Sequence, residues 1–137
     1  DLMRYLVGKK IVSHHATMIG SSPHIDIRSD KVSINLSFED GSFGTIHYLS
    51  NGGKAFPKER VEVFCGDSAL QMDNYRILKG FDWPNFSKMK SVRQDKGQIS
   101  CSKAFVDSIK QGKASPISYD EIIECSRISI EVSESLS

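Results

Sequence analysis

Two neighbouring histidines, His14 and His15, are the first side chains in this sequence with the chemistry to ligate a metal ion. They lie in the stretch from Lys9 to Gly20, whose alternating character predicts a β-strand. Successive side chains of a strand point to opposite faces, so the two imidazoles do not converge on one ion. His24 and His47 have no partner nearby in the sequence. The sequence therefore predicts no metal site.

The sequence also contains no motif for phosphate binding and no pair of carboxylates for acid–base catalysis. The stretch NGGK, from Asn51 to Lys54, lacks the spacing with which the amides of a phosphate-binding loop wrap a phosphate, and it predicts a turn. Four carboxylates fall at predicted hairpin ends or on strand faces, and their spacing sets no two of them into one cleft. These are Glu39, Asp40, Glu59 and Glu62. The residue chemistry alone predicts no self-contained active site.

Composition limits the class of partner. The chain has 137 residues, of which 39% are hydrophobic and 26% charged, and this suits one domain with one core. Its apolar runs are too short to cross a bilayer. Eighteen basic and seventeen acidic residues give a formal net charge of +1, which provides no broad field to attract a nucleic acid. We expect neither a membrane nor a nucleic acid as partner.

The three cysteines, Cys65, Cys101 and Cys125, form no C-x-x-C pair. An odd number of cysteines is typical of reduced thiols in a cytoplasmic protein rather than of a secreted disulfide framework. We expect all three to be buried as small hydrophobic side chains.

The middle of the chain predicts antiparallel strands. The run from Val32 to Phe38 alternates apolar and polar residues, as a half-buried strand does. Asp40 and Gly41 predict a tight hairpin with positive φ at both positions, and its second strand is FGTIHYLS. RVEVFC and ALQMDN predict two strands about a turn at Gly66, and YRILKGF is compatible with another. The stretch from Asp82 to Gly97 predicts a solvated loop.

The ends of the chain have helical spacing. DLMRYLVG, from Asp1 to Gly8, predicts the end of a helix, with Leu2, Tyr5 and Leu6 on one apolar face and Gly8 as a left-handed cap. Two closing helices are predicted, and the second begins with a capping box of Ser118 and Glu121. The apolar sides expected are Cys101, Phe105 and Ile109 in the first closing helix and Ile122, Ile123 and Ile130 in the second. This order of elements predicts an α+β fold, an open, mostly antiparallel β-sheet with helices packed on one face.

The succession of motifs resembles a known family. DLMRYLVG, INLSFEDGSFGTIHY, KERVEVFCGDSALQMDNYRIL and KAFVDSIKQGKASPISYDEIIECSRISIEVSESL, in this order, are similar to the carboxy-terminal domain of the Gfo/Idh/MocA oxidoreductases. The resemblance spans nearly the whole chain. In that family an amino-terminal Rossmann domain binds NAD(P), and the second domain closes the substrate site and commonly dimerises through the exposed face of its sheet. One departure is the Cys65–Ser68 turn, where the family often has Gly-x-x-Gly, but Gly66 still supplies a positive φ.

The resemblance implies a division of the chain. Residues 1–8 would be the end of an interdomain helix containing Asp1 and Arg4, and residues 9–137 a single substrate and dimerisation domain of a longer parent. Asp1 resembles the Asp of the family's H-x-x-D sequence, which places the catalytic histidine just before Asp1. Asn51, Lys54 and Lys58 are candidates for lining the mouth of the substrate site.

The implied reaction of the parent is hydride transfer between NAD or NADP and a hydroxyl carbon of a sugar, polyol or related small molecule. The chain alone would hold no catalytic or cofactor-binding residue and would be inactive. Its partners would be its own Rossmann domain and a second copy. An alternative of a different class is a non-catalytic sheet domain for protein–protein interaction. The face that would serve it carries Phe43, Thr45, His47 and Leu49.

Overall fold

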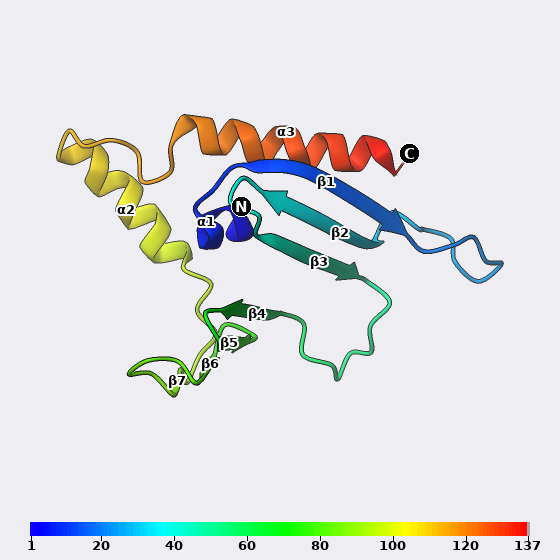
Figure 1. The fold of residues 1–137 in the computed structure, drawn as a ribbon, viewed down its shortest axis with the longest axis horizontal. Helices are drawn as coiled ribbons and strands as arrows, with labels where there is room; N and C mark the ends of the chain where they lie inside the picture. The colour runs from blue at the N-terminus through cyan, green and yellow to red at the C-terminus, as the bar shows by residue number, and fades with distance from the viewer. Residues whose placement is uncertain (137) are drawn as a thin grey trace. The chain divides into compact units, whose positions relative to one another are not determined.

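The computed structural model describes residues 1–136 and shows an α+β fold of helices and antiparallel strands, as the sequence predicts (Figure 1). The elements are α1 (Leu2–Val7), β1 (Ile11–Met18), β2 (Lys31–Phe38), β3 (Phe43–Leu49), β4 (Arg60–Cys65), β5 (Ser68–Asp73), β6 (Ile77–Phe81), β7 (Lys88–Lys90), α2 (Gln98–Lys110) and α3 (Tyr119–Ser135). Among the helices of residues 1–136, none has both the length and the apolar character needed to span a bilayer.

The strands form two sheets instead of one continuous sheet, with the orders β1-β2-β3 and β4-β5-β6-β7. The loop between β3 and β4 contains two glycines and Pro57, so no tight hairpin carries the hydrogen-bond ladder across it. The chain accordingly folds as two compact units, Asp1–Gly52 with Gly112–Ser137, and Gly53–Gln111.

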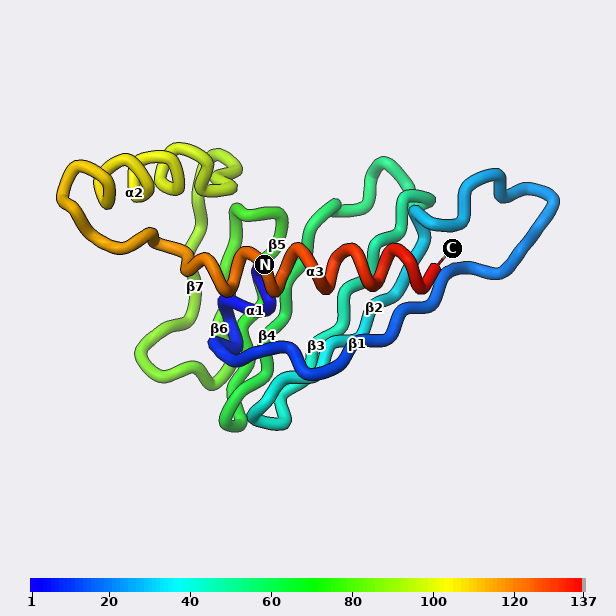
Figure 2. Tube along the Cα trace, turned by 90° about the horizontal axis from the view of Figure 1, so that it is seen from above, coloured from blue at the N-terminus to red at the C-terminus, as the bar shows by residue number. Residues whose placement is uncertain are grey.

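The core of the first unit lies between one face of β1-β2-β3 and the helices α1 and α3. The predicted alternation of β2 is confirmed, because Leu36 and Phe38 are buried on the helix side. They pack against Ile128 and Val132 of α3, with Met3 of α1 against the same cluster. Figure 2 shows α3 running along β1. Helices thus cover one face of this sheet, as predicted.

The predicted apolar side of α3 was wrong, and the predicted apolar face of α1 does not point to the core. Leu2, Tyr5 and Leu6 are exposed, and α1 turns Met3 and Val7 to the core instead. In α3 the expected isoleucines are exposed, and the side toward the sheet carries Ile128 and Val132. The exposed isoleucines are Ile122, Ile123 and Ile130. The physical reason is that the inward side of α3 also carries carboxylates that bind partners on α1 and β1.

The β2–β3 hairpin forms where Asp40 and Gly41 predict it, with a different turn. Only Gly41 has positive φ, at 84°, and Phe38 N–H donates to the Ser42 carbonyl at 2.9 Å. The loop therefore has three residues, and its last residue, Gly41, is left-handed. A loop of this kind matches the twist of the two strands and needs no positive φ at Asp40. The Asp40 carboxylate accepts the Ser42 amide at 3.0 Å, and this hydrogen bond lowers the pKa of Asp40.

The second unit is built around the sheet β4-β5-β6-β7. Its register places Val61, Met72 and Leu78 in one row of one face. On the same face a Cβ at residue 80 would lie 2.6 Å from the Phe86 carbonyl oxygen, so Gly80 lets the loop after β6 fold back onto the sheet. That loop contains the short strand β7, which the sequence analysis missed because KMK has no apolar period and forms only by pairing with β6.

The capping residues of α1 and α3 lie where the sequence predicts them. Gly8 caps α1 with φ of 69°, and Ser118 and Glu121 form the predicted capping box of α3. α2 forms as predicted, but Phe105 and Ile109 on its apolar side are exposed.

The cysteines are free thiols, but the prediction that they are buried was wrong. Cys65 and Cys101 are exposed, and Cys125 is half-buried. Cys65 ends an edge strand and Cys101 lies on α2, so neither is on a face that the described part of the protein covers.

The packing predicts that Phe38, only 2% exposed, dominates the stability of the first unit. Phe38→Ala should lower the free energy of unfolding by about 3 kcal/mol, because it removes buried apolar surface and leaves a cavity. The measurement is urea denaturation followed by circular dichroism. Phe56→Ala, at an exposed phenylalanine, is the control and should change stability by less than about 0.5 kcal/mol. Equal losses in both variants would contradict this core.

Candidate functional site

Arg4, expected in an interdomain helix, is held inside the first unit by α3. Its Nε donates to Glu124 Oε2 at 3.2 Å, and its Nη1 lies 3.5 Å from Glu121 Oε1. The other oxygen of Glu124 accepts the Ile11 amide at 2.6 Å. The side chains of Arg4 and Glu124 are each 11% exposed. A single carboxylate therefore fastens the helix α1, the first residue of β1 and the helix α3 together.

Glu124 stays ionised in this position. Burial raises the pKa of its carboxyl, but the Ile11 amide and the Arg4 guanidinium together lower that pKa by more, so that it lies below the ordinary value of 4.5. The charge matters because the half-buried Ile11 amide and the half-buried Arg4 guanidinium both donate to it.

A second carboxylate joins β1 to α3. His14 Nε2 lies 3.0 Å from Glu131 Oε2, and Arg127 Nη1 donates to Glu131 Oε1 at 2.7 Å. The Arg127 hydrogen bond, followed by that of His14, lowers the pKa of Glu131. His15 turns to the other face, where its Nε2 lies 3.3 Å from Thr17 Oγ1. The two histidines point apart as predicted, and residues 1–136 contain no cluster of three metal-ligating side chains.

The candidate substrate residues lie on the exposed loop between β3 and β4. Asn51 belongs to the first compact unit, whereas Lys54 and Lys58 belong to the second. In the described part of the chain, no hydrogen bond or ion pair holds their side chains. Asp1 is exposed, and its carbonyl accepts the Tyr5 amide at 2.9 Å to start α1. The role of these four residues in substrate binding or catalysis stays a prediction.

The face of β1-β2-β3 away from the helices is polar except for Phe43 and has no Lys, Arg, Asp or Glu in its three central rows. The register defines the rows as Ser13, Ser37 and Phe43; His15, Asn35 and Thr45; and Thr17, Ser33 and His47. Thr45 Oγ1 donates to Asn35 Oδ1 at 2.7 Å. Lys31, at the end of this face, is neutralised by Asp30 at 2.6 Å. Depletion of charge is typical of the centre of a protein–protein interface. We call these nine residues the uncharged face.

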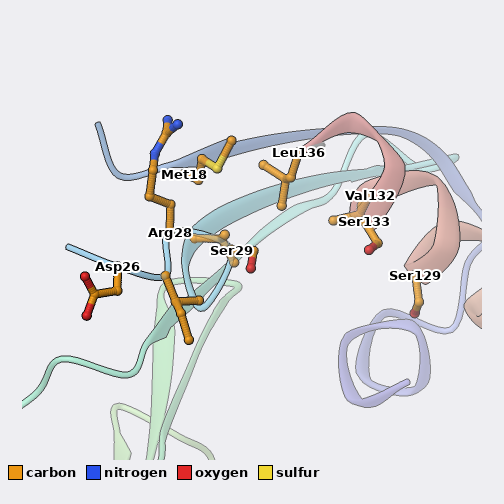
Figure 3. Close-up of a pocket in the computed structure, with 10 residues that line it drawn as sticks. Met18, Asp26, Arg28, Ser29, Ser129, Val132, Ser133 and Leu136 are labelled. Carbon is orange, nitrogen blue, oxygen red and sulfur yellow. The ribbon is translucent and has the colours of Figure 1, made fainter. Parts of the chain in front are cut away.

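A hollow of about 750 Å³ opens where the last turns of α3 meet the end of β1 and the following loop. Figure 3 shows Val132 and Leu136 of α3 on one side and Met18 on the other, with Arg28 extending away from the helix. Arg28 is turned outward because its Nε donates to the Ile19 carbonyl at 2.8 Å. Half of the ten described lining residues are apolar, and Asp26 is the one carboxylate among them, so these residues offer no pair of carboxylates for acid–base catalysis.

The sequence analysis missed Glu124 and Glu131 as positioning residues. A signal for them exists in the spacing of Glu124, Ile128, Glu131 and Val132, which fall on one side of a helix. The isoleucines of this stretch predict a different side, and a carboxylate on the inward face of a helix is recognised only if its partners on α1 and β1 are known.

Comparison of the chain with protein families, curated proteins and solved structures finds no match in any of the three.

The Glu124 contacts predict a pH-dependent stability. Its pKa is lower in the folded protein than in the unfolded chain, so the unfolded chain binds more protons in acid. The stabilisation is present above about pH 4.5 and is lost as the pH falls through the folded pKa. Glu124→Gln should lower the free energy of unfolding by about 2 kcal/mol at pH 7 and by much less near pH 3.

Urea denaturation at a series of pH values measures this difference. Glu134→Gln, at an exposed position of the same helix, is the matched control and should follow the wild type at every pH. A Glu124→Gln deficit that is the same at pH 3 and pH 7 would show that the charge has no role.

Proposed function

We propose that this chain is the substrate-side and oligomerisation domain of an NAD(P)-dependent oxidoreductase acting on a sugar, polyol or related hydroxyl substrate. The ordered motifs that resemble the Gfo/Idh/MocA carboxy-terminal domain support the proposal, and an α+β fold with helices on one face of an open sheet agrees with it. The free thiols agree with a reducing compartment, and we place the protein in the cytoplasm.

The outward face of α1 is the observation that carries the proposal. Leu2, Tyr5 and Leu6 lie there exposed, and Tyr5 is 79% accessible. The helix cannot turn this face inward, because the Arg4–Glu124 pair and the packing of Met3 fix its orientation. A fixed apolar helix face of this kind is suited to docking another domain. We assign that place to a nucleotide-binding Rossmann domain.

The chain's own residues do not fit NAD(P). A dinucleotide site needs parallel strands joined by a helix that starts at a glycine-rich turn. Every strand pair in the described residues is antiparallel, and the NGGK stretch leads into a loop rather than a helix. We therefore assign the cofactor to the Rossmann domain and the catalytic histidine to the position just before Asp1, and we derive no hydride-transfer step through this chain. Asn51, Lys54 and Lys58 would contribute to substrate binding.

The cofactor assignment predicts a difference between the chain and its parent. The product of the longest open reading frame that contains this chain should bind NADH or NADPH in a fluorescence titration, whereas residues 1–137 alone should bind neither. Binding by the isolated chain, or failure of both proteins, would contradict the proposal. Failure of both would instead favour the non-catalytic interaction domain.

The uncharged face is proposed as the contact with a second copy of the chain. Its hydroxyl, amide and imidazole groups both donate and accept hydrogen bonds, so two copies of the face can satisfy each other across a two-fold axis. The absence of charge removes the repulsion that a symmetric contact would otherwise place between identical residues.

A charge in the middle of the uncharged face should therefore weaken self-association. Asn35→Lys places two ammonium groups against each other in a symmetric dimer, and we expect the dimer dissociation constant to rise at least tenfold, by about 1.4 kcal/mol or more. Sedimentation velocity measures the constant. Ser126→Lys adds the same charge at an exposed position on α3 and should leave it unchanged. A monomeric wild type, or equal weakening by both variants, would exclude this interface.

A further inference from the structure

A second hollow lies in the unit Gly53–Gln111, and none of its lining residues belongs to a surface assigned to the proposed function. It has a volume of about 350 Å³ and sits at the turn between β4 and β5, next to the end of β6. Two aromatic side chains, Phe64 and Phe81, and two carboxylates, Asp67 and Asp82, line it. We call it the Phe64–Phe81 slot.

The sheet register gives the slot its shape. Phe64 pairs with Ala69 on β5, and Ala69 pairs with Phe81 on β6, so the three side chains form one row on the same face. Strands are about 4.8 Å apart, which places the two phenylalanines roughly 10 Å apart across a small alanine floor. A flat group needs about 3.5 Å to each neighbouring surface and fits this width. Phe64 is 79% exposed and Phe81 49%, so both rings are accessible.

The charge at the slot is negative. Asp67 lies at the tip of the turn and Asp82 just after β6, both at positive φ, and Ser68 Oγ donates to the Asp82 carbonyl at 2.8 Å. This hydrogen bond ties the end of β6 to the turn. Neither carboxylate forms an ion pair within residues 1–136. Lys79, on the same face of β6, is directed to Asp73, with Nζ 4.0 Å from Oδ2.

Aromatic faces beside carboxylates select one kind of ligand. A cation is attracted by the faces of the rings and by the carboxylates, whereas an anion is repelled by the carboxylates. Guanidinium suits the site better than ammonium, because it is flat, weakly hydrated and able to stack on a ring while it donates to a carboxylate. We infer that the Phe64–Phe81 slot binds an arginine side chain presented by a segment of a protein partner. The two carboxylates and the two exposed rings at the slot favour this occupant by charge complementarity and by stacking.

The test is a titration of the whole 137-residue chain with the peptide acetyl-Gly-Arg-Gly-amide, followed by amide chemical shifts. We expect saturable shifts at residues 64–69 and 81–82 that weaken as salt is added. The same peptide with citrulline in place of arginine keeps the shape and loses the charge, and it should bind at least tenfold more weakly. An absence of shifts at these residues, or equal binding of the citrulline peptide, would overturn the inference.

Variants separate the two parts of the slot. The double variant Asp67→Asn, Asp82→Asn removes the charge, and asparagine tolerates the positive φ of both positions, so the turn is retained. It should weaken arginine-peptide binding at least fivefold, as should Phe64→Ala. Phe105→Ala, at an exposed phenylalanine of α2, is the matched control and should bind as the wild type does. If the spectrum of Phe64→Ala shows that this variant is unfolded, the test rests on the double variant. Arginine-peptide binding by the double variant equal to that of the wild type would contradict the inference.

Discussion

The carboxylate of Glu124 is the contact on which the arrangement of the first unit depends. It accepts hydrogen bonds from the Arg4 guanidinium of α1 and from the Ile11 amide of β1, and it does so from the middle of α3. Separating this nearly buried carboxylate from its two donors costs free energy, because each donor would be left without a partner. The rotation of α3 is thereby set, and Ile128 and Val132 rather than the neighbouring isoleucines meet the sheet.

The same contact decides which surfaces remain open. Since α1 is fixed by Arg4 and packs through Met3, its other side, with Tyr5 at the centre, stays exposed. Both α1 and α3 lie on one side of β1-β2-β3, which leaves the uncharged face on the other side. The apolar helix face and the uncharged sheet face are two distinct exposed surfaces, and the proposed function gives one to a nucleotide-binding domain and the other to a second copy.

Sequence reasoning was accurate where a local rule suffices and failed where a distant partner decides. The alternation of β2, the left-handed Gly8 and the capping box of Ser118 and Glu121 depend on neighbours in the chain, and all were predicted. The inward face of α3 was missed because Glu124 and Glu131 bind partners more than a hundred residues away in the sequence. The strand β7 forms only by pairing with β6, and the division into two sheets depends on which strands pair; the spacing of single segments predicts neither. The candidate residues Asn51, Lys54 and Lys58 came from the family resemblance, and their position on an exposed loop does not decide their role.

Hydroxyl-radical footprinting of Tyr5 tests the central claim, that the outward face of α1 is covered by another domain of the parent. Tyr5 is 79% exposed in this chain, and Tyr119, at the start of α3 and 75% exposed, is an internal reference. We predict that oxidation of Tyr5 relative to Tyr119 falls several-fold in the product of the longest open reading frame compared with the isolated chain. The same ratio in both proteins would contradict the claim, because the face would then be as open in the parent as it is here.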